Sequence, residues 1–247
     1  MPKVINVRNN PKGPYVYIGR PEQNGYPLHF GNPFLMNAES ERDLVCYQFD
    51  AWITNGYTLM GSGSRQEWVI DNLILLHGKD LGCWCTPKRC HGDTLLKLAP
   101  NTGGRPVFRV IVAGGRDFSD YQLPESKLDS ILEKKVGSHF VVILSGQARG
   151  ADTLGESYAE RHRHDIVRFP AYWKLQGRRA GMIRNAAMRR YADAAVVFWD
   201  GGSKGTAEMI AGCRHDNIPL RIISYRKPSD EMEYGIDPNG GEYFGAK

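Results

Sequence analysis

The sequence predicts an α/β protein. Its second half is expected to form a doubly wound parallel sheet of about five strands, preceded by a second, smaller α/β or α+β domain. Two observations support this. From residue 107 to residue 225, near-continuous apolar runs alternate with amphipathic segments, a pattern typical of parallel strands covered by helices on both faces. A cluster of Pro and Gly at residues 100–106 separates this half from a less regular first half.

The apolar runs of the second half predict its strands, and helical periodicity predicts the segments between them. We expect strands at residues 107–113, 140–144, 166–169, 194–199 and 220–225, and helices at residues 127–136, 151–162, 179–191 and 206–215. This alternation is Rossmann-like. A ligand crevice is therefore expected at the carboxyl ends of the strands.

Shorter patterns organise the first half. We expect strands at residues 4–7, 16–18 and 81–85, and helices at residues 41–55, 65–76 and 92–98, with Trp52, Trp68 and Ile70 facing a core. The predicted organisation is a small Cys/His-containing domain at residues 1–99, a linker at 100–106, a nucleotide-binding domain at 107–225 and a polar tail at 226–247. The Gly/Pro-rich tail is expected to be extended or partly disordered.

Composition and charge restrict the function classes. No apolar run approaches the roughly 18 residues that a membrane span needs, and no secretory signal is evident, so we expect a cytoplasmic protein without membrane contact. Residues 100–225 carry 19 basic against 13 acidic residues, and 14 of the 19 are Arg. Arg suits phosphate recognition, but the excess is too small for a duplex-binding stripe. A small polyanionic ligand is therefore the expected partner rather than nucleic acid, and homo-oligomer formation stays open.

Three Gly-rich segments follow predicted strands at the ligand edge, and each carries a cation. Glycine lets the backbone approach a ligand closely, and the N–H groups at a helix start favour an anion. One such segment alone has about even odds of being ordinary turn chemistry, but three at one edge favour a phosphate site. Neither GxxxxGK[ST] nor GxGxxG occurs. The predicted ligand-binding residues are Gly114, Gly115, Arg116, Ser145, Gly146, Arg149, Gly150, Arg184, Asn185, Gly201, Gly202, Lys204, Gly205 and Thr206.

Three acidic residues are candidates for general acid–base catalysis near these segments. Asp152 and Glu156 are four residues apart, so both project from one face of a predicted helix. Glu208 lies in the helix that the last Gly-rich turn opens. Each could exchange a proton with a ligand or order a ribose. The alternative for each is a solvated helix face.

Residues 107–225 resemble the SLOG superfamily, and within it the YspA-type branch. The resemblance is carried by Gly114-Gly-Arg-Asp-Phe118, Ser145-Gly-Gln-Ala-Arg-Gly-Ala-Asp152, Phe169-Pro-Ala-Tyr-Trp173, Ala180-Gly-Met-Ile-Arg-Asn185 and Trp199-Asp-Gly-Gly-Ser-Lys-Gly-Thr206. It implies that these loops bind a nucleotide or a nucleotide-derived molecule.

The enzymatic members of this superfamily carry an Arg-Lys-x-x-Met helix and a Pro-Gly-Gly-x-Gly-Thr-x-x-Glu turn, whose Arg and last Glu act on an N-glycosidic bond. Arg184 and Met188 match this helix, whereas Asn185 replaces the Lys. Met209 stands where the Glu is expected, and Glu208 is one residue early, about 100° around a helix. The resemblance thus supports binding more directly than hydrolysis.

A dense cysteine cluster lies in the first half. Cys83, Cys85, Cys90 and His91 have the ligand types of a zinc site, although adjacent Cys-His ligands are strained on one metal. A second interpretation is buried thiols that pack as small hydrophobes, with His91 and Asp93 starting a helix. A third is a Cys90 thiolate at a helix N-terminus. Zinc is the one cofactor that the sequence leaves open, and Cys90, His91 and Asp93 are further candidates to complete the catalytic site.

The run from Cys83 to Asp93, together with Gly31-Asn-Pro-Phe34 upstream, resembles the DUF4326 family of bacteria and phages. The hallmark of that family is Cys-Trp-Cys-x-Pro-x-x-Cys-His-Gly-Asp. The resemblance implies that the cysteine cluster is a family feature, and it supplies no chemistry.

Together these observations predict binding of a phosphorylated nucleoside derivative, such as a nucleoside monophosphate, NAD or ADP-ribose, with cleavage or transfer at its N-glycosidic bond. Such an activity would make the protein an N-glycosidase-type hydrolase or a glycosyl transferase. The first alternative is a non-catalytic sensor or sequestering protein for a nucleotide signal, which Met209 favours. The second is a single-stranded nucleic-acid binding module, which the modest net charge disfavours.

Overall fold

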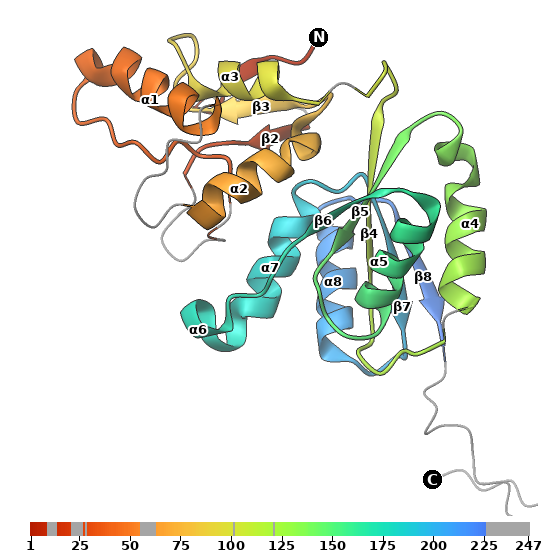
Figure 1. Ribbon diagram of the computed structural model, residues 1–247. Helices are drawn as coiled ribbons and strands as arrows, with labels where there is room; N and C mark the ends of the chain where they lie inside the picture. Colours follow the sequence, from red (N-terminus) through yellow and green to blue (C-terminus); the bar gives the residue numbers. More distant parts are fainter. Residues whose placement is uncertain are drawn as a thin grey trace, which may run out of the picture.

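The computed structural model (Figure 1) describes residues 1–8, 14–20, 27, 29–54, 63–100, 102–120 and 122–225. The predicted tail at 226–247, and Asn101 of the predicted linker, lie outside the described residues. The described chain forms two parallel sheets, one of three strands and one of five. We refer to residues up to 100 as the N-terminal region and to residues 102–225 as the C-terminal region.

The C-terminal region confirms the predicted five-stranded parallel sheet. Its strands are β4 (Val107–Gly114), β5 (Phe140–Ser145), β6 (Asp165–Arg168), β7 (Ala194–Trp199) and β8 (Leu220–Ser224). They lie in the order β6-β5-β4-β7-β8, and all neighbouring pairs are parallel. The chain therefore reverses its direction of winding between β4 and β7. That is the topological switch point at which doubly wound sheets form their ligand crevice.

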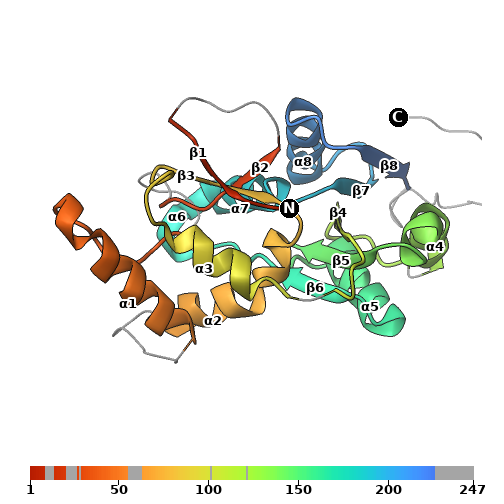
Figure 2. The ribbon, with the colours of Figure 1, turned by 90° about the horizontal axis from the view of Figure 1, so that it is seen from above.

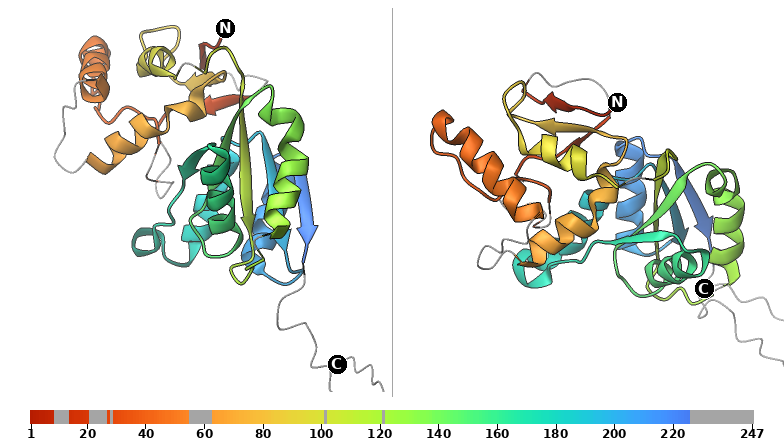
Figure 3. Two further views of the ribbon diagram at one scale, coloured as in Figure 1. Left: turned by 45° about the vertical axis from the view of Figure 1, so that its right-hand side comes forward. Right: turned by 45° about the horizontal axis from the view of Figure 1, so that its top comes forward.

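Helices cover both faces of this sheet. The chain forms α4 (Gln122–Val136), α5 (Ala151–His162), α6 (Trp173–Gln176), α7 (Ala180–Arg189) and α8 (Lys204–His215), with a short 3₁₀ helix, η3 (Gly177–Arg179), between α6 and α7. Successive residues of β4 point to opposite faces: Val110 and Val112 pack with α4 and α5, and Ile111 and Ala113 pack with α7 and α8. Figure 3 shows the helices on the two sides of the sheet.

Helix α4 begins five residues before the predicted start. The Oδ1 atom of Asp120 accepts hydrogen bonds from the N–H groups of Gln122 and Leu123, at 2.9 and 3.1 Å. A carboxylate in that position satisfies donors that a helix start leaves unpaired. Pro124 then lies in the first turn, where its missing N–H costs nothing. The short helix α6 was not expected from the sequence.

The N-terminal region contains a small parallel sheet, which settles the open choice in favour of α/β. Its strands are β1 (Val4–Asn6), β2 (Tyr15–Tyr17) and β3 (Asp80–Cys83), in the order β1-β3-β2. The helices are α1 (Arg42–Thr54), α2 (Gly63–Asp71) and α3 (His91–Leu98), with short 3₁₀ helices η1 (Glu39–Glu41) and η2 (Leu73–Leu76). Figure 2 shows α1, α2 and α3 to one side of the strands.

The helix predicted at residues 65–76 divides into α2 and η2. The side chain of Asn72 donates to the carbonyl oxygen of Trp68 at 2.6 Å, at the point where α2 ends. The prediction that Ile70 faces a core is wrong, because Ile70 is 43% exposed. Trp68 and Val69 occupy the buried side of α2, and the helical twist turns the next residue outward.

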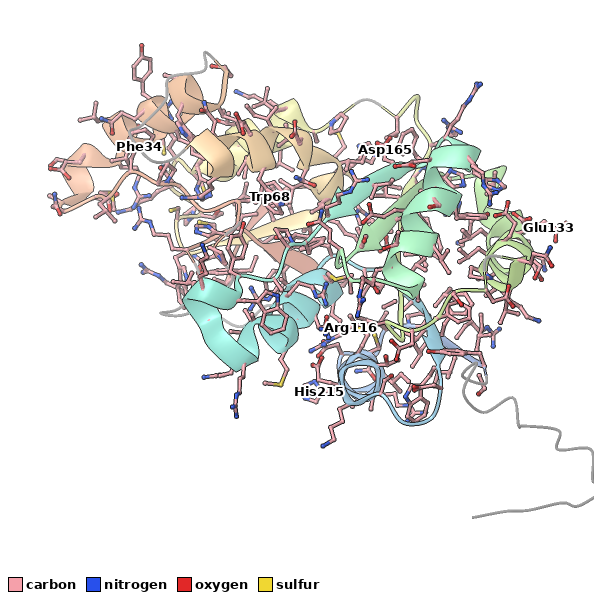
Figure 4. The ribbon with its side chains drawn as sticks, turned by 60° about the horizontal axis from the view of Figure 1, so that its bottom comes forward. Phe34, Trp68, Arg116, Glu133, Asp165 and His215 are labelled. Atoms are coloured by element: carbon pink, nitrogen blue, oxygen red, sulfur yellow. The ribbon has the colours of Figure 1, made fainter. Side chains whose placement is uncertain are left out.

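An aromatic cluster joins the two regions, with two rings from each. Phe30 and Trp68 come from the N-terminal region, and Phe169 and Tyr191 from the C-terminal region. The centroid of the Phe30 ring lies 5.2 Å from that of Trp68 and 6.0 Å from that of Tyr191. The centroid of the Phe169 ring lies 6.3 Å from that of Trp68 and 5.9 Å from that of Tyr191. All four rings are buried, and Figure 4 shows Trp68 between the two regions. The regions thus share one continuous core.

A buried cation makes a second connection between the regions. Arg109 of β4 is 1% exposed and donates to the carbonyl oxygens of Ile74, at 3.0 Å, and of His77. Its Nη1 lies 3.1 Å from Oδ2 of Asp193, and Lys79 binds the other oxygen of the same carboxylate. None of the described helices has the length and apolar character needed to cross a membrane.

Candidate functional site

A crevice of about 420 Å³ opens at the switch point between β4 and β7. Its walls are the ends of these strands and the starts of α5, α7 and α8. Figure 4 views the molecule from this side and shows Arg116 between α5 and α8. Of the residues predicted from the sequence, the crevice is lined by Gly114, Gly115, Arg116, Asp152, Arg184, Asn185, Gly205, Thr206 and Glu208.

The remaining predicted residues of the C-terminal region lie outside this lining. They are Ser145, Gly146, Arg149, Gly150, Glu156, Gly201, Gly202 and Lys204. Ser145, Gly146, Arg149 and Gly150 lie at the end of β5 and in the loop after it, which the sequence predicts to be equivalent to the loops after β4 and β7. The hydrogen bonds within the loops explain why they differ in what they present to the crevice.

The loop after β7 presents a helix start to the crevice. The Oδ1 atom of Asp200 accepts the N–H groups of Gly202 and Ser203, at 3.0 and 2.8 Å, and so fixes the turn. The next N–H groups, of Lys204, Gly205 and Thr206, begin α8, where a helix has no intrahelical partner for them. Gly205 and Thr206 line the crevice, so the partial positive charge of their N–H groups lies at its wall beside the hydroxyl of Thr206.

The loop after β5 is already bound to an anion of the protein itself. The Oδ2 atom of Asp152 accepts the N–H groups of Gly146 and Ala148, at 3.1 and 3.4 Å. The N–H of Ala151 at the start of α5 donates to the carbonyl oxygen of Gly115. Gly150 precedes this helix with φ of 80°. The donors predicted to hold phosphate here therefore hold a carboxylate that lines the crevice.

Burial shapes the acidity of that carboxylate. Asp152 is 4% exposed. Burial raises the pKa of Asp152 from its ordinary 3.8 to about 6, although the nearby Arg184 and the N–H groups of Ala148 and Gly146 act in the opposite direction. A carboxyl group with a pKa near 6 is mostly ionised at pH 7 yet accepts a proton readily, which suits a general base.

Arg184 lies deep in the same wall, where it is 9% exposed. Its Nη1 lies 3.7 Å from Oδ2 of Asp152 and donates to the carbonyl oxygen of Gly146. Its Nε donates to Oδ1 of Asn185 at 2.8 Å. A Cβ at Gly146 would overlap Nη1 of Arg184. Glycine is therefore required at this position so that the guanidinium can reach its place in the wall.

Glu208 continues this row of polar groups along α7 and α8. The amide of Asn185 donates to its Oε2 at 2.6 Å, and Nη1 of Arg189 lies 3.3 Å from its Oε1. Both Glu208 and Met209 line the crevice, but Met209 is 2% exposed and its sulfur contacts Cys213. Glu208 thus forms part of the crevice wall, although it lies one position before the place of the Glu in the enzymatic SLOG pattern.

Glu156 is directed elsewhere than Asp152. It accepts a hydrogen bond from the hydroxyl of Ser145 at 2.5 Å and one from Nε of Arg168 at 2.7 Å. The hydroxyl of Ser145 also accepts the N–H of Gln147 at 3.0 Å. These contacts hold the loop after β5 in place, and they leave Asp152 and Glu208 as the predicted acids at the crevice.

Sequence reasoning missed residues at the entrance of α7. Trp173 of α6 and Arg178 of η3 both line the crevice, and Trp173 is 52% exposed. The ring of Trp173 lies next to Gly181, where an added Cβ would be 3.6 Å away. The motif Phe169-Pro-Ala-Tyr-Trp173 contained the signal, but the short helix that presents the ring was not expected.

The cysteine cluster lies in the N-terminal region, at a cavity of about 380 Å³ separate from the crevice. Cys90, His91 and Asp93 were expected to complete the crevice, yet none of them lines it. Cys90 precedes α3; its N–H donates to Oδ2 of Asp93 at 3.1 Å, and its sulfur accepts the N–H of Gly92 at 3.4 Å. Asp93 is thus a helix cap.

The thiols of this cluster are in mutual contact. The sulfurs of Cys83 and Cys85 are 3.6 Å apart, and the sulfur of Cys90 is 3.6 Å from Nδ1 of His91. Neighbouring Cys83 and Cys85 raise the pKa of the Cys90 thiol, whereas hydrogen bonds from Cys83 and Cys90, together with Arg42, lower the pKa of the Cys85 thiol.

The fold and the crevice define a Rossmann-like α/β protein with an open crevice at the switch point of its sheet. Residues 108–175 match the family described as "YspA, cpYpsA-related SLOG family", and residues 5–101 match "Domain of unknown function (DUF4326)". Both resemblances inferred from the sequence are confirmed, in the predicted order. The SLOG match indicates nucleotide-related binding.

A phage protein is among the relatives of this chain. The sequence is 29% identical over 125 residues to the "Gene 61 protein" of Mycobacterium phage D29. The match covers 45% of this chain and 93% of the phage protein. The relationship therefore extends over nearly the whole of that shorter protein, whose name states no activity.

Proposed function

We propose that the crevice binds a phosphorylated nucleoside derivative and cleaves or transfers its N-glycosidic bond. The single observation that carries this proposal is the pairing of opposite chemistries in one crevice. The open helix start at Gly205 and Thr206 favours an anion, and the buried carboxyl of Asp152 is suited to proton transfer. A nucleotide presents a phosphate to the first and a sugar to the second.

The phosphate end of the ligand is assigned to the start of α8. The N–H groups of Gly205 and Thr206, the hydroxyl of Thr206 and the exposed side chain of Arg116 all border the crevice there. Asp200 fixes the preceding turn, so these donors are held in position before a ligand arrives. Such preorganised N–H groups bind phosphate without further rearrangement.

The base is assigned to the opposite end, against Trp173. This ring is half exposed and borders the crevice beside Arg178. An aromatic face stacks with any nucleobase, and stacking of this kind contributes roughly 1–3 kcal/mol. This arrangement leaves the sugar between the two ends, next to the wall formed by Asp152 and Glu208.

Asp152 acts in the proposed reaction as the general base. It removes one proton from a water molecule or an acceptor hydroxyl as the oxygen bonds to C1′ of the sugar. The bond from C1′ to the base nitrogen breaks with its electron pair leaving on the base. The base takes up a proton from water, and Asp152 returns its own proton to solvent. Arg184 lies 3.7 Å from Oδ2 of Asp152 and keeps the carboxylate charged between turnovers.

The second candidate is a sensor that binds the same ligand without turnover. Two observations favour it. Met209 occupies the place of the acid in the enzymatic family pattern, and Glu208 is held by Asn185 and Arg189.

The test incubates the purified full chain with nucleotides, NAD, ADP-ribose and cyclic dinucleotides. Mass spectrometry then reads the free and the protein-retained fractions. Release of a base with a new sugar phosphate supports the proposal. One compound retained intact establishes the sensor instead, and salt-dependent retention of oligonucleotides alone would point to the nucleic-acid module.

Two matched variants assign the residues. Asp152→Asn is expected to lower turnover by about 10²- to 10⁴-fold with binding retained. Asp117→Asn is the control, because Asp117 borders the same crevice but is exposed. Equal loss in both variants would remove Asp152 from the mechanism, and an Arg184→Ala variant that binds nucleotides as well as the wild type would remove the phosphate role of Arg184.

A further inference from the structure

We propose that the N-terminal region binds one zinc ion through Cys83, Cys90 and His91, with the fourth coordination position beside Cys85 and facing the cavity. This site is separate from the crevice, so the inference does not depend on the proposed nucleotide chemistry. Thiolate sulfur and imidazole nitrogen are the ligands that zinc takes in proteins.

The ligand atoms already lie together. One sulfur from Cys83, one from Cys90 and one ring nitrogen from His91 lie within 4.8 Å of one another, and all three residues are buried. In a tetrahedral site with zinc–sulfur bonds of about 2.3 Å and zinc–nitrogen bonds of about 2.0 Å, two sulfurs are about 3.8 Å apart and a sulfur and a nitrogen about 3.5 Å. The distance from Cys90 to Nδ1 of His91 is 3.6 Å.

The orientation of His91 fits the role of a ligand. Its Nε2 lies 3.0 Å from the carbonyl oxygen of Ile18. A carbonyl oxygen only accepts, so Nε2 carries the proton and Nδ1 presents its lone pair toward Cys90. A metal-bound histidine usually donates its second nitrogen in this way, which fixes both the tautomer and the ring. The ring also packs edge-on against Phe49, with centroids 5.1 Å apart.

The backbone conformation allows Cys90 and His91 to bind one metal ion although they are adjacent in the chain. Cys90 is extended, with φ −138° and ψ 144°, whereas His91 is the first residue of α3. This change of conformation brings both side chains to one side of the chain. The N–H of Gly92 donates to the sulfur of Cys90 at 3.4 Å, a contact that a metal-bound sulfur can keep.

Cys85 borders the fourth position. Its sulfur is 3.6 Å from that of Cys83, and both residues line the cavity of about 380 Å³. Arg42 lines the same cavity. A position bordered in this way is accessible from the cavity, as in zinc sites that keep one exchangeable ligand.

Metal analysis of the purified full chain is the first test, and about one zinc per chain is expected. After chelation, titration with cobalt(II) alone is expected to give a thiolate charge-transfer band and visible bands of tetrahedral coordination. Both readouts use the wild-type chain, so they do not depend on how a variant folds. Zinc well below one equivalent, together with no cobalt spectrum, would overturn the proposal.

Variants then identify the ligands. Cys90→Ser is expected to lose the metal. Cys46→Ser is the matched control, because Cys46 is a buried thiol of the same cavity outside the ligand set. Retention of the metal in Cys90→Ser, or equal loss in both variants, would contradict the assignment. Cys85→Ser is expected to keep the zinc, and loss there as complete as in Cys90→Ser would overturn the open fourth position.

Discussion

Replacement of Asp193 by Asn tests the buried connection between the two regions. Arg109 is 1% exposed, and the carboxylate of Asp193 is the acidic group that it contacts, at 3.1 Å. The variant leaves a buried guanidinium without its counter-charge, although the carbonyl oxygens of Ile74 and His77 still accept from it. Burial already lowers the pKa of Arg109, with Asp193 acting against this effect.

The magnitude follows from the burial of the pair. Removal of one partner of a fully buried ion pair costs about 3–5 kcal/mol. The Asp193 side chain is 21% exposed and that of Lys79 is 25% exposed, so solvent screens part of the effect and we expect a loss of about 2–4 kcal/mol. With a urea dependence of about 3 kcal/mol per molar for a chain of this size, the unfolding midpoint should fall by about 1 M.

Urea unfolding of three variants checks this reasoning. Asp43→Asn is the control, because its pair with Arg89 is on the surface and its side chain is 82% exposed; its midpoint should not move. The double variant Arg109→Met with Asp193→Asn should regain most of the lost stability, because it also removes the buried charge. A loss below about 1 kcal/mol in Asp193→Asn, or no recovery in the double variant, would refute the argument.

Three further predictions concern the crevice. Gly146→Ala places a methyl group on Nη1 of Arg184 and should weaken nucleotide binding about 10- to 100-fold by calorimetry; unchanged affinity would contradict the placement of Arg184. Trp173→Ala should weaken binding about 5- to 150-fold without changing the melting temperature, and an unaltered dissociation constant would remove the ring from the site. Burial raises the pKa of Asp152 from 3.8 to about 6, so the folded state keeps a proton that the unfolded chain releases between these values. Wild-type stability should therefore gain up to about 3 kcal/mol, relative to Asp152→Asn, as the pH falls from above 6 to below 4. Urea unfolding across this range measures the difference, and parallel curves would show an ordinary pKa.

The sequence predicted the C-terminal sheet because hydrophobic periodicity reports burial directly. The run from Val107 to Ala113 is apolar except at Arg109, and the strand is covered on both faces. The exact ends of the helices were less predictable, because each end depends on the capping contact of a single side chain. Asp120 starts α4 early through a side-chain contact, which no periodicity records.

The site was predictable only in part, because similar loops have different partners in space. The segments after β5 and after β7 both contain Gly and a cation. In the first, the loop amides bind Asp152, and in the second the helix start faces the crevice. The position of Trp173 depends on a short helix without periodicity. The domain boundaries at residues 99 and 107 stay a prediction.

The four-ring cluster of Phe30, Trp68, Phe169 and Tyr191 has a consequence for how such chains recombine. Each region supplies two of the rings, so a crossover at residues 100–106 that exchanged one region for an unrelated sequence would leave the other with half of this cluster. The rings of the two regions must therefore be matched whenever such regions are recombined. Expression of each half alone should give insoluble protein, whereas co-expression of the two halves should recover a soluble complex.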